Sequence, residues 1–239
     1  MKYLIILFFI PINIFSQDFI QRLEDSPRHH EWKKLVNNNR EEINTFIVFP
    51  EVAKKVPVII LIHENRGLNY WARSMADQIA EMGYIVLAPD LLSGTAPDGG
   101  GTTSFKNSDQ ARTAIYDLSP EKVTSDLDVV FKYGKNIDSA NGKVAVIGFC
   151  WGGSQTFKYA TNNSSISAAF VCYGTGPKNE IDYKNITAPI YGFYGGNDNR
   201  VNATIENSVS AMKKAKSFYE PVIYDGAGHG FFRAGENID

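Results

Sequence analysis

One cysteine stands between two glycines in the segment Gly148-Phe149-Cys150-Trp151-Gly152. A nucleophile flanked in this way is typical of a sharp turn from a strand into a helix, where the residues two before and two after must lack bulk. The helix that begins there directs its N-terminus at the sulfur and favours a thiolate. The spacing predicts that Cys150 is a nucleophile; the alternative is a small core cysteine among glycines.

An acid and a base follow the cysteine in the order that such a site requires. Asp198 comes just after the apolar segment 189–194, and His229 follows the last apolar segment, 220–224. Both positions are carboxyl ends of predicted strands, which is where open α/β sheets assemble their sites. We predict that His229 acts as general base and then as general acid, and that Asp198 orients its imidazole.

The segment HENRG at 63–67 follows another predicted strand. The loop after this strand typically supplies one amide of an oxyanion hole, so we predict that the backbone N–H groups of Asn65 and Trp151 form that hole. Glu64 is a carboxylate at a buried strand end and has two interpretations. It is either a member of a structural ion pair or a group coupled to the thiol of Cys150.

Alternating strand and helix patterns position these residues. Continuous apolar runs, typical of strands buried on both faces, cover 56–62, 84–88, 143–149, 168–173, 189–194 and 220–224. Helical spacing covers 70–82, 108–133 in two segments, a segment from about 152, and 203–214. Segment 43–48 indicates a half-buried strand near an edge, 93–104 a Gly-rich loop, and 18–39 an irregular polar stretch. The alternation predicts an α/β fold with a mostly parallel central sheet and helices on both faces.

Composition narrows the class of protein. The chain has 239 residues, 44% of them hydrophobic, and a net charge of −2, which suits one globular domain over residues 17–239. The charge balance argues against nucleic-acid partners and anionic membranes. His29 and His30 have no second cluster at ligand spacing, so we expect solvent-facing histidines, no metal and no cofactor. We expect a monomer that acts on a small molecule.

The first residues form a separate unit. Met1 and Lys2 precede an apolar run over 3–15, and Ser16 offers a small residue for cleavage. This pattern predicts a signal peptide over 1–16 and a secreted or periplasmic mature protein with no membrane contact. The alternatives are an uncleaved anchor or a buried strand. In an oxidising compartment, Cys150 and Cys172 could form a disulfide, although this would block the nucleophile.

From about residue 44 to residue 233, the chain resembles the dienelactone hydrolase family of α/β-hydrolases. The shared motifs are HE followed by Gly67, APDL at 88–91, GFCWGG at 148–153, YGGND at 194–198, and GAGHGF at 226–231 with Arg233. The resemblance implies an α/β-hydrolase fold. It also implies that Cys150 rests as a thiol beside Glu64, which takes the thiol proton when substrate binds, and that Arg233 binds a substrate carboxylate.

Two departures from the family pattern have consequences. Members carry a second arginine soon after APDL, whereas this chain has none between 91 and 105, and Arg66 is the candidate replacement. This makes the anionic dienelactone substrate doubtful, and the chain is closer to a secreted branch with HENRGL and a GGGT loop. Members also continue into a C-terminal helix, whereas this chain stops at Asp239. A truncated sequence, or a less covered flank of the sheet, is expected.

These observations converge on a function. We predict a hydrolase of small esters or lactones, of the carboxymethylenebutenolidase type, that forms an acyl-thioester on Cys150 and releases it with water activated by His229. One alternative is an acyltransferase or thioesterase with the same triad. The other is a catalytically silent secreted binding protein.

Overall fold

The computed structural model describes residues 14–37 and 39–236 of the chain. The predicted signal peptide at 1–16 lies almost wholly outside these residues, so it stays a prediction. The last three residues, 237–239, also lie outside them. Within the described ranges, no helix combines the length and the apolar character needed to cross a membrane.

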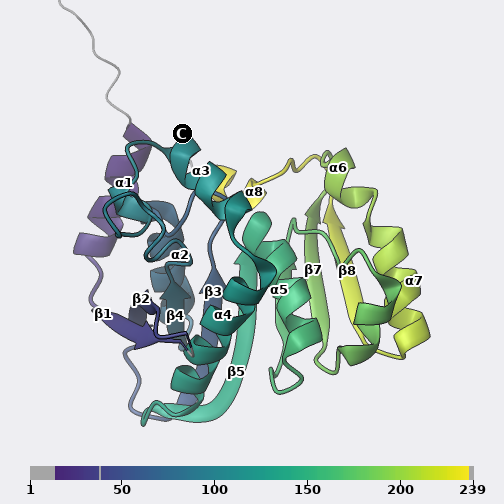
Figure 1. The fold of residues 1–239 in the computed structure, drawn as a ribbon, viewed down its shortest axis with the longest axis horizontal. Coiled ribbons are helices and arrows are strands. Elements are labelled where there is room, and N and C mark those ends of the chain that lie inside the picture. Colours follow the sequence, from purple (N-terminus) through teal and green to yellow (C-terminus); the bar gives the residue numbers. More distant parts are fainter. Residues whose placement is uncertain (1–13, 38, 237–239) are drawn as a thin grey trace, which may run out of the picture.

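Eight strands form one sheet in the order β1-β2-β4-β3-β5-β6-β7-β8 (Figure 1). Their bounds are β1 His29–Val36, β2 Glu42–Phe49, β3 Val56–Ile62, β4 Ile85–Pro89, β5 Ala140–Phe149, β6 Ala169–Cys172, β7 Ile190–Gly195 and β8 Tyr219–Tyr224. The strands from β4 across to β8 are parallel, whereas β1–β2 and β2–β4 are antiparallel pairs. The predicted mostly parallel sheet is confirmed, and the carboxyl ends of its parallel strands meet at one edge.

Helices cover both faces of the sheet (Figure 1). One face is covered by α1 Ile14–Glu24, α2 Tyr70–Glu81 and α8 Phe231–Ala234, and the other by α4 Pro120–Lys135, α5 Trp151–Asn162 and α7 Ile205–Ala215. The short helix α6 Asn199–Asn202 and the helix α3 Ser108–Asp117 lie at the carboxyl edge (Figure 1). Strand side chains alternate between the two faces, which is why the sheet carries an apolar core on each side.

Helix termini follow the sequence closely. The side chain of Ser119 accepts a hydrogen bond from the backbone of Lys122, and Pro120 occupies the first turn of α4, as predicted. The helix expected over 203–214 begins instead at Ile205, because the chain first forms the separate turn α6, capped by Asp198. Asp198 therefore has a structural task in addition to any chemical one.

The prediction that 18–39 is irregular is wrong. This segment contains the end of α1 and the whole of β1, which pairs with β2 from His29 to Val36. β1 reads as polar because it is an edge strand, and charged side chains on an edge prevent pairing with other chains. The expectation of solvent-facing histidines fails for His30, whose Nε2 lies 2.8 Å from Oδ1 of Asp77.

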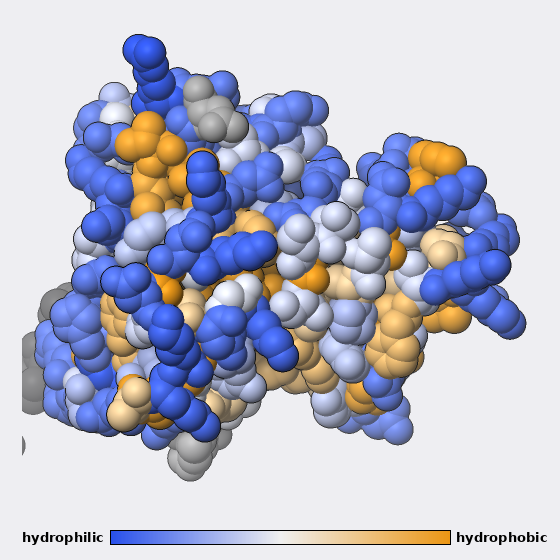
Figure 2. Space-filling view, turned by 90° about the horizontal axis from the view of Figure 1, so that it is seen from below, coloured by the Kyte–Doolittle hydropathy of each residue, from blue (hydrophilic) through white to orange (hydrophobic). Residues whose placement is uncertain are grey.

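The opposite edge of the sheet is sparsely covered. The side chains of Phe218, Val222 and Ile223 are 54%, 37% and 50% exposed. Figure 2 shows hydrophobic side chains at the surface toward the β7–β8 end of the molecule. Apolar residues therefore reach solvent beside β8, while the β3–β5 centre of the sheet is buried.

Candidate active site

Cys150 lies on the turn between β5 and α5, in a backbone conformation with φ of 57° and ψ of −113°. A Cβ atom on Gly148 would stand 2.1 Å from the carbonyl oxygen of Gly152, and one on Gly152 would stand 2.3 Å from the carbonyl oxygen of Ile62. Both distances are far below van der Waals contact. The flanking glycines are thus required by close backbone approach, and Cys150 stands in the positive-φ region that side chains rarely adopt.

The structure brings Cys150, His229 and Asp198 together. His229 Nε2 lies 3.1 Å from Cys150 Sγ, and His229 Nδ1 lies 2.5 Å from Asp198 Oδ2. Asp198 is 6% exposed, and its other oxygen accepts a hydrogen bond from the backbone of Val201. The imidazole of His229 therefore contacts the sulfur of Cys150 with one nitrogen and the buried carboxylate of Asp198 with the other.

The thiol of Cys150 is held in its protonated form. Burial raises the pKa of Cys150, and the negative charge of Glu64 raises it further. The backbone N–H groups of Trp151 and Asn65 and the charge of Arg200 favour the thiolate, but they offset the rise in pKa only in part. The two amides expected to form an oxyanion hole both face the nucleophile.

Glu64 lies two residues after the end of β3 and is a buried carboxylate with two partners. Its Oε2 accepts a hydrogen bond from Nε of Arg233 at 3.1 Å, and its Oε1 accepts one from the hydroxyl of Tyr173 at 3.3 Å. Among the described residues, no hydrogen bond joins Glu64 to Cys150. The carboxylate is near enough to raise the pKa of the thiol but is directed at Arg233 and Tyr173.

Tyr173 is a site residue that the sequence analysis missed. It follows β6, has φ of 40°, and packs edge-on against the ring of His229 at 5.0 Å between centroids. Burial, followed by the charge of Glu64, raises its pKa, so its hydroxyl stays a donor. Its position directly after a strand, at the same edge as Cys150, is the signal that could have identified it.

His63 was also overlooked as a separate residue. It is fully buried; its Nδ1 lies 2.8 Å from the carbonyl oxygen of Glu64, and its Nε2 accepts a hydrogen bond from the backbone of Leu91. Burial lowers its pKa, so the ring is neutral. The ring stacks on Trp151 at 5.7 Å. His63 thus links the segment after β3 to the segment after β4, next to the turn that carries Cys150.

A cavity of about 570 Å³ opens over the sulfur. Its lining is Glu64, Asn65, Arg66, Arg112, Tyr116, Cys150, Trp151, Ser154, Tyr173, Thr175, Arg200, His229 and Arg233. Every candidate site residue except the buried Asp198 lines it, including Arg66 and Arg233. Arg112, Tyr116 and Arg200 were not predicted. Their signal is weak, since Arg112 and Tyr116 lie one turn apart on α3 and Arg200 lies two residues after Asp198.

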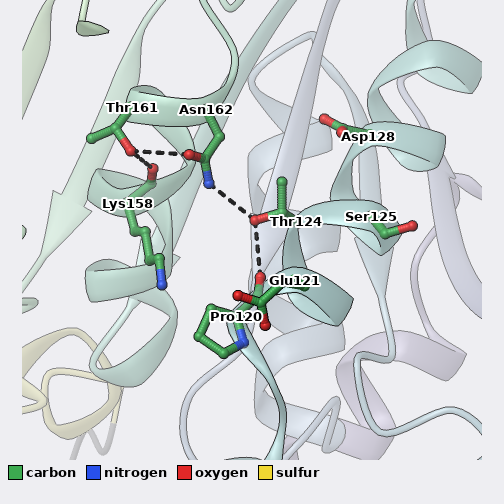
Figure 3. Close-up of a pocket in the computed structure, with 8 residues that line it drawn as sticks. All are labelled: Pro120, Glu121, Thr124, Ser125, Asp128, Lys158, Thr161 and Asn162. Atoms are coloured by element: carbon green, nitrogen blue, oxygen red, sulfur yellow. Dashed lines mark hydrogen bonds between the residues drawn. The ribbon is translucent and has the colours of Figure 1, made fainter. Parts of the chain in front are cut away.

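A second cavity, of about 680 Å³, lies between α4 and α5. Figure 3 shows its hydroxyl and amide groups, with Asn162 donating to Thr124 at 3.0 Å. Its lining has no cysteine or histidine, and its only basic side chain is Lys158. Its lining therefore lacks the pairing of a cysteine with a histidine that the cavity over Cys150 has, and the latter is the candidate active site.

Cys150 and Cys172 both carry free thiols in the structure. The backbone N–H of Cys150 donates to the carbonyl oxygen of Cys172 at 3.0 Å, so the two residues are neighbours without a disulfide. Cys172 is fully buried in the core, and burial raises its pKa well above the ordinary value. It has the environment of a small core residue.

Comparison with known proteins agrees with this geometry. The model of the dienelactone hydrolase family matches residues 43–239. A protein of Escherichia coli K12, provisionally named a carboxymethylenebutenolidase, is 30% identical over 187 residues, which cover 74% of this chain and 68% of that protein. The carboxymethylenebutenolidase of Pseudomonas putida is 28% identical over 182 residues, with coverage of 74% and 75%.

Solved structures show the same fold. A crystal structure from Klebsiella pneumoniae, provisionally described as a dienelactone hydrolase, superposes with a TM-score of 0.76. The sequence identity is 23%, and the match covers 87% of this chain and 90% of that one. The predicted fold class, an α/β-hydrolase fold, is therefore confirmed.

Proposed function

The chain belongs to the dienelactone hydrolase family, and on this premise we propose that it cleaves small esters or lactones through an acyl-thioester on Cys150. Membership makes it a hydrolase of ester or lactone bonds; the proposal concerns how its residues act. One observation carries the proposal: His229 Nε2 lies 3.1 Å from the Sγ atom of Cys150, which is on the strained turn between β5 and α5. A base within hydrogen-bond reach of a nucleophile, itself oriented by Asp198, is the arrangement that acyl transfer needs.

The first half-reaction forms the thioester. The thiolate of Cys150 attacks the carbonyl carbon, and the oxygen that becomes negative lies between the N–H groups of Asn65 and Trp151. When the intermediate collapses, the carbon–oxygen bond to the leaving group breaks. The proton lost by the thiol is delivered to the departing alkoxide by His229, which is neutral again when the thioester has formed. In a lactone, the departing alkoxide stays tethered to the acyl group.

The second half-reaction releases the acid. Neutral His229 takes a proton from water, and the hydroxide oxygen attacks the thioester carbonyl between the same two amides. Collapse then breaks the carbon–sulfur bond, and the proton on His229 passes to the sulfur, which restores the resting thiol of Cys150. Asp198 stabilises the imidazolium in both halves, because its carboxylate stays on Nδ1.

Glu64 supplies the step that starts the cycle. The raised pKa of Cys150 keeps the thiol protonated, and Glu64 is held away by Arg233 and Tyr173. A substrate anion that binds Arg233 competes for the partner of Glu64. The released carboxylate can then take the thiol proton. This order would protect the thiol from oxidation until substrate arrives.

The nucleophile is tested by acylation and turnover together. We expect Cys150→Ala to lose hydrolysis of p-nitrophenyl acetate and of small lactones, and wild-type protein to gain one acyl group by intact mass spectrometry. Cys172→Ala is the matched control, because it removes a buried thiol outside the cavity. Equal turnover by wild type and Cys150→Ala would overturn the proposal. A silent binding protein would show neither turnover nor acylation.

The product distribution separates the remaining alternatives. A hydrolase gives free acid even when methanol or glycerol is present, whereas an acyltransferase gives the new ester in preference. A thioesterase would cleave an acyl-thioester of the same acyl group faster than the oxygen ester. Chromatographic analysis of products from one acyl group in three leaving-group forms distinguishes the classes.

We also propose that residues 1–16 direct export and are removed. Expression of the full chain with fractionation of a bacterial host tests this proposal. A secreted or periplasmic product whose N-terminus is Gln17 supports it. A product that retains Met1 and stays with the cytoplasm or the membrane contradicts it.

A further inference from the structure

Arginines are concentrated at the cavity over Cys150. Arg66, Arg112, Arg200 and Arg233 line it, which is half of the eight arginines in the chain. No lysine belongs to the lining within the described residues, and the only carboxylate there is Glu64. The whole chain has a net charge of −2, so the positive charge of the cavity lining is opposite in sign to the charge of the protein. Such a cleft attracts anions and repels cations.

Only one of these four guanidinium groups has a carboxylate partner. Arg233 is paired with Glu64. Over residues 14–37 and 39–236, Arg66, Arg112 and Arg200 form no ion pair with Asp or Glu. One substrate carboxylate at Arg233 would leave three cations around the cavity without a counter-charge. The number of cations exceeds what a single anionic group requires.

The three unpaired arginines line the cavity from different segments, with Arg66 in the 63–67 loop. Arg112 is carried by α3, which is fixed over the 63–67 loop because the hydroxyl of Tyr116 accepts a hydrogen bond from the Asn65 side chain at 3.1 Å. Arg200 is carried by α6, after β7, and its positive charge acts on the thiol of Cys150. Arg233 reaches Glu64 from α8. Arg112 and Arg200 therefore line the cavity from elements other than the one that carries Arg233.

We propose that the cleft selects ester or lactone substrates with two anionic groups, one bound by Arg233 and the second bound by Arg112 and Arg200. This inference rests on the proposed function and specifies its substrate class. A guanidinium binds a planar carboxylate through two parallel hydrogen bonds, which explains the choice of arginine over lysine. Arg112 and Arg200 supply the second cationic site that the 91–105 segment lacks.

Binding of small acids to Cys150→Ala protein tests the inference without turnover. We expect isothermal titration calorimetry at 0.15 M salt to show that glutarate, with two carboxylates, binds at least about tenfold more tightly than butyrate, with one. Arg112→Gln and Arg200→Gln should each weaken glutarate binding by about 10- to 100-fold and remove most of this preference. Lys106→Gln is the matched control: Lys106 is exposed just before α3 but does not line the cavity.

Two results would overturn the inference. One is equal affinity for glutarate and butyrate, which means that the arginines are solvated surface groups. The other is an equal loss in Lys106→Gln and Arg112→Gln, which means a diffuse effect of charge. Wild-type turnover is measured separately. Absent ester hydrolysis with a preserved glutarate preference rejects only the proposed function, whereas hydrolysis without that preference rejects only the two-anion cleft.

Discussion

Two arginine–carboxylate pairs of this molecule have similar chemistry and different surroundings. Arg28 binds Asp77 where β1 meets α2, and Arg233 binds Glu64 in the cavity over Cys150. Both carboxylates are buried, with side-chain exposures of 6% for Asp77 and 8% for Glu64. Burial of the acid is therefore not what separates them.

The two carboxylates differ in the number of hydrogen bonds that they make. Asp77 accepts two hydrogen bonds from Arg28, at 2.6 and 2.9 Å, and one from Ser26 at 2.6 Å, and it also faces His30. Burial alone would raise the pKa of Asp77, but the bonds from Arg28, Ser26 and His30 outweigh it and hold the pKa below the ordinary value. The Arg28 side chain is only 11% exposed, so this pair is closed to solvent and to ligands.

Glu64 has far fewer bonds. It accepts one hydrogen bond from Arg233 at 3.1 Å and one from Tyr173 at 3.3 Å. The Arg233 side chain is 51% exposed at the cavity, where an anion can reach it. The Arg28–Asp77 pair, in which several hydrogen bonds occupy the carboxylate, fixes two elements of the fold. The Arg233–Glu64 pair has fewer hydrogen bonds and is accessible, so its members can exchange partners. The two pairs therefore differ in the accessibility of the cation and not in the burial of the anion.

The largest expected effect comes from Glu64→Gln. If Glu64 takes the thiol proton, kcat/KM should fall by about 10²- to 10⁴-fold, the range for general acid–base groups. The free energy of unfolding should change by less than about 1 kcal/mol, because Arg233 is half-exposed. Steady-state kinetics and urea unfolding of one preparation measure both. A large loss of stability with unchanged kinetics would make Glu64 structural.

Asp77→Ala should give the reverse pattern. It leaves the buried Arg28 without its carboxylate, so we expect the free energy of unfolding to fall by about 3–5 kcal/mol. kcat/KM per folded molecule should stay near the wild-type value, because Asp77 does not line the cavity over Cys150. Glu42→Gln, in the exposed pair with Lys34, is the control and should barely change stability. A kinetic defect in folded Asp77→Ala would break the comparison.

Thiol alkylation should respond in the direction opposite to turnover. Burial and the charge of Glu64 raise the pKa of Cys150, so the thiolate fraction at pH 8 is below that of a free cysteine. Glu64→Gln removes the charge that raises the pKa and leaves Arg233 unpaired, and both changes favour the thiolate. The iodoacetamide rate at pH 8 should therefore increase, and the pH–rate curve should move to lower pH.

Cys172 and Asp77 provide the controls for this measurement. Cys172→Ala in both backgrounds leaves Cys150 as the only cysteine, and Asp77→Ala should leave the alkylation curve in place. An unchanged curve in Glu64→Gln would mean that the carboxylate does not act on the sulfur.

The smallest expected effect comes from Arg28→Lys. Lysine keeps the charge but replaces the two-bond fork with a single ammonium group, so we expect the free energy of unfolding to fall by about 1 kcal/mol. Urea unfolding midpoints measure the loss. A stability equal to that of wild type would show that charge alone, without the saturated geometry, holds β1 against α2.

The sequence predicted the centre of the sheet and the turn that carries Cys150 far better than the periphery. Strands such as 56–62 and 143–149 are buried on both faces, so their composition is independent of their partners. β1 was missed because an edge strand is defined by its neighbour β2, and its own residues are polar. The site shows the same division. Cys150 was found from its own glycines, whereas Tyr173 was missed because its role depends on Glu64.

The sequence by itself determined the elbow at Cys150, the order of Asp198 and His229 behind it, and the parallel sheet that brings them to one edge. These follow from local spacing and from the rule that parallel strands end together. Only the tertiary structure decided which partners hold Glu64 and which arginines line the cavity. Arg112 and Arg200 reach the cavity because α3 packs over the 63–67 loop and α6 turns after β7. Such contacts join segments distant in the chain, and no local pattern encodes them.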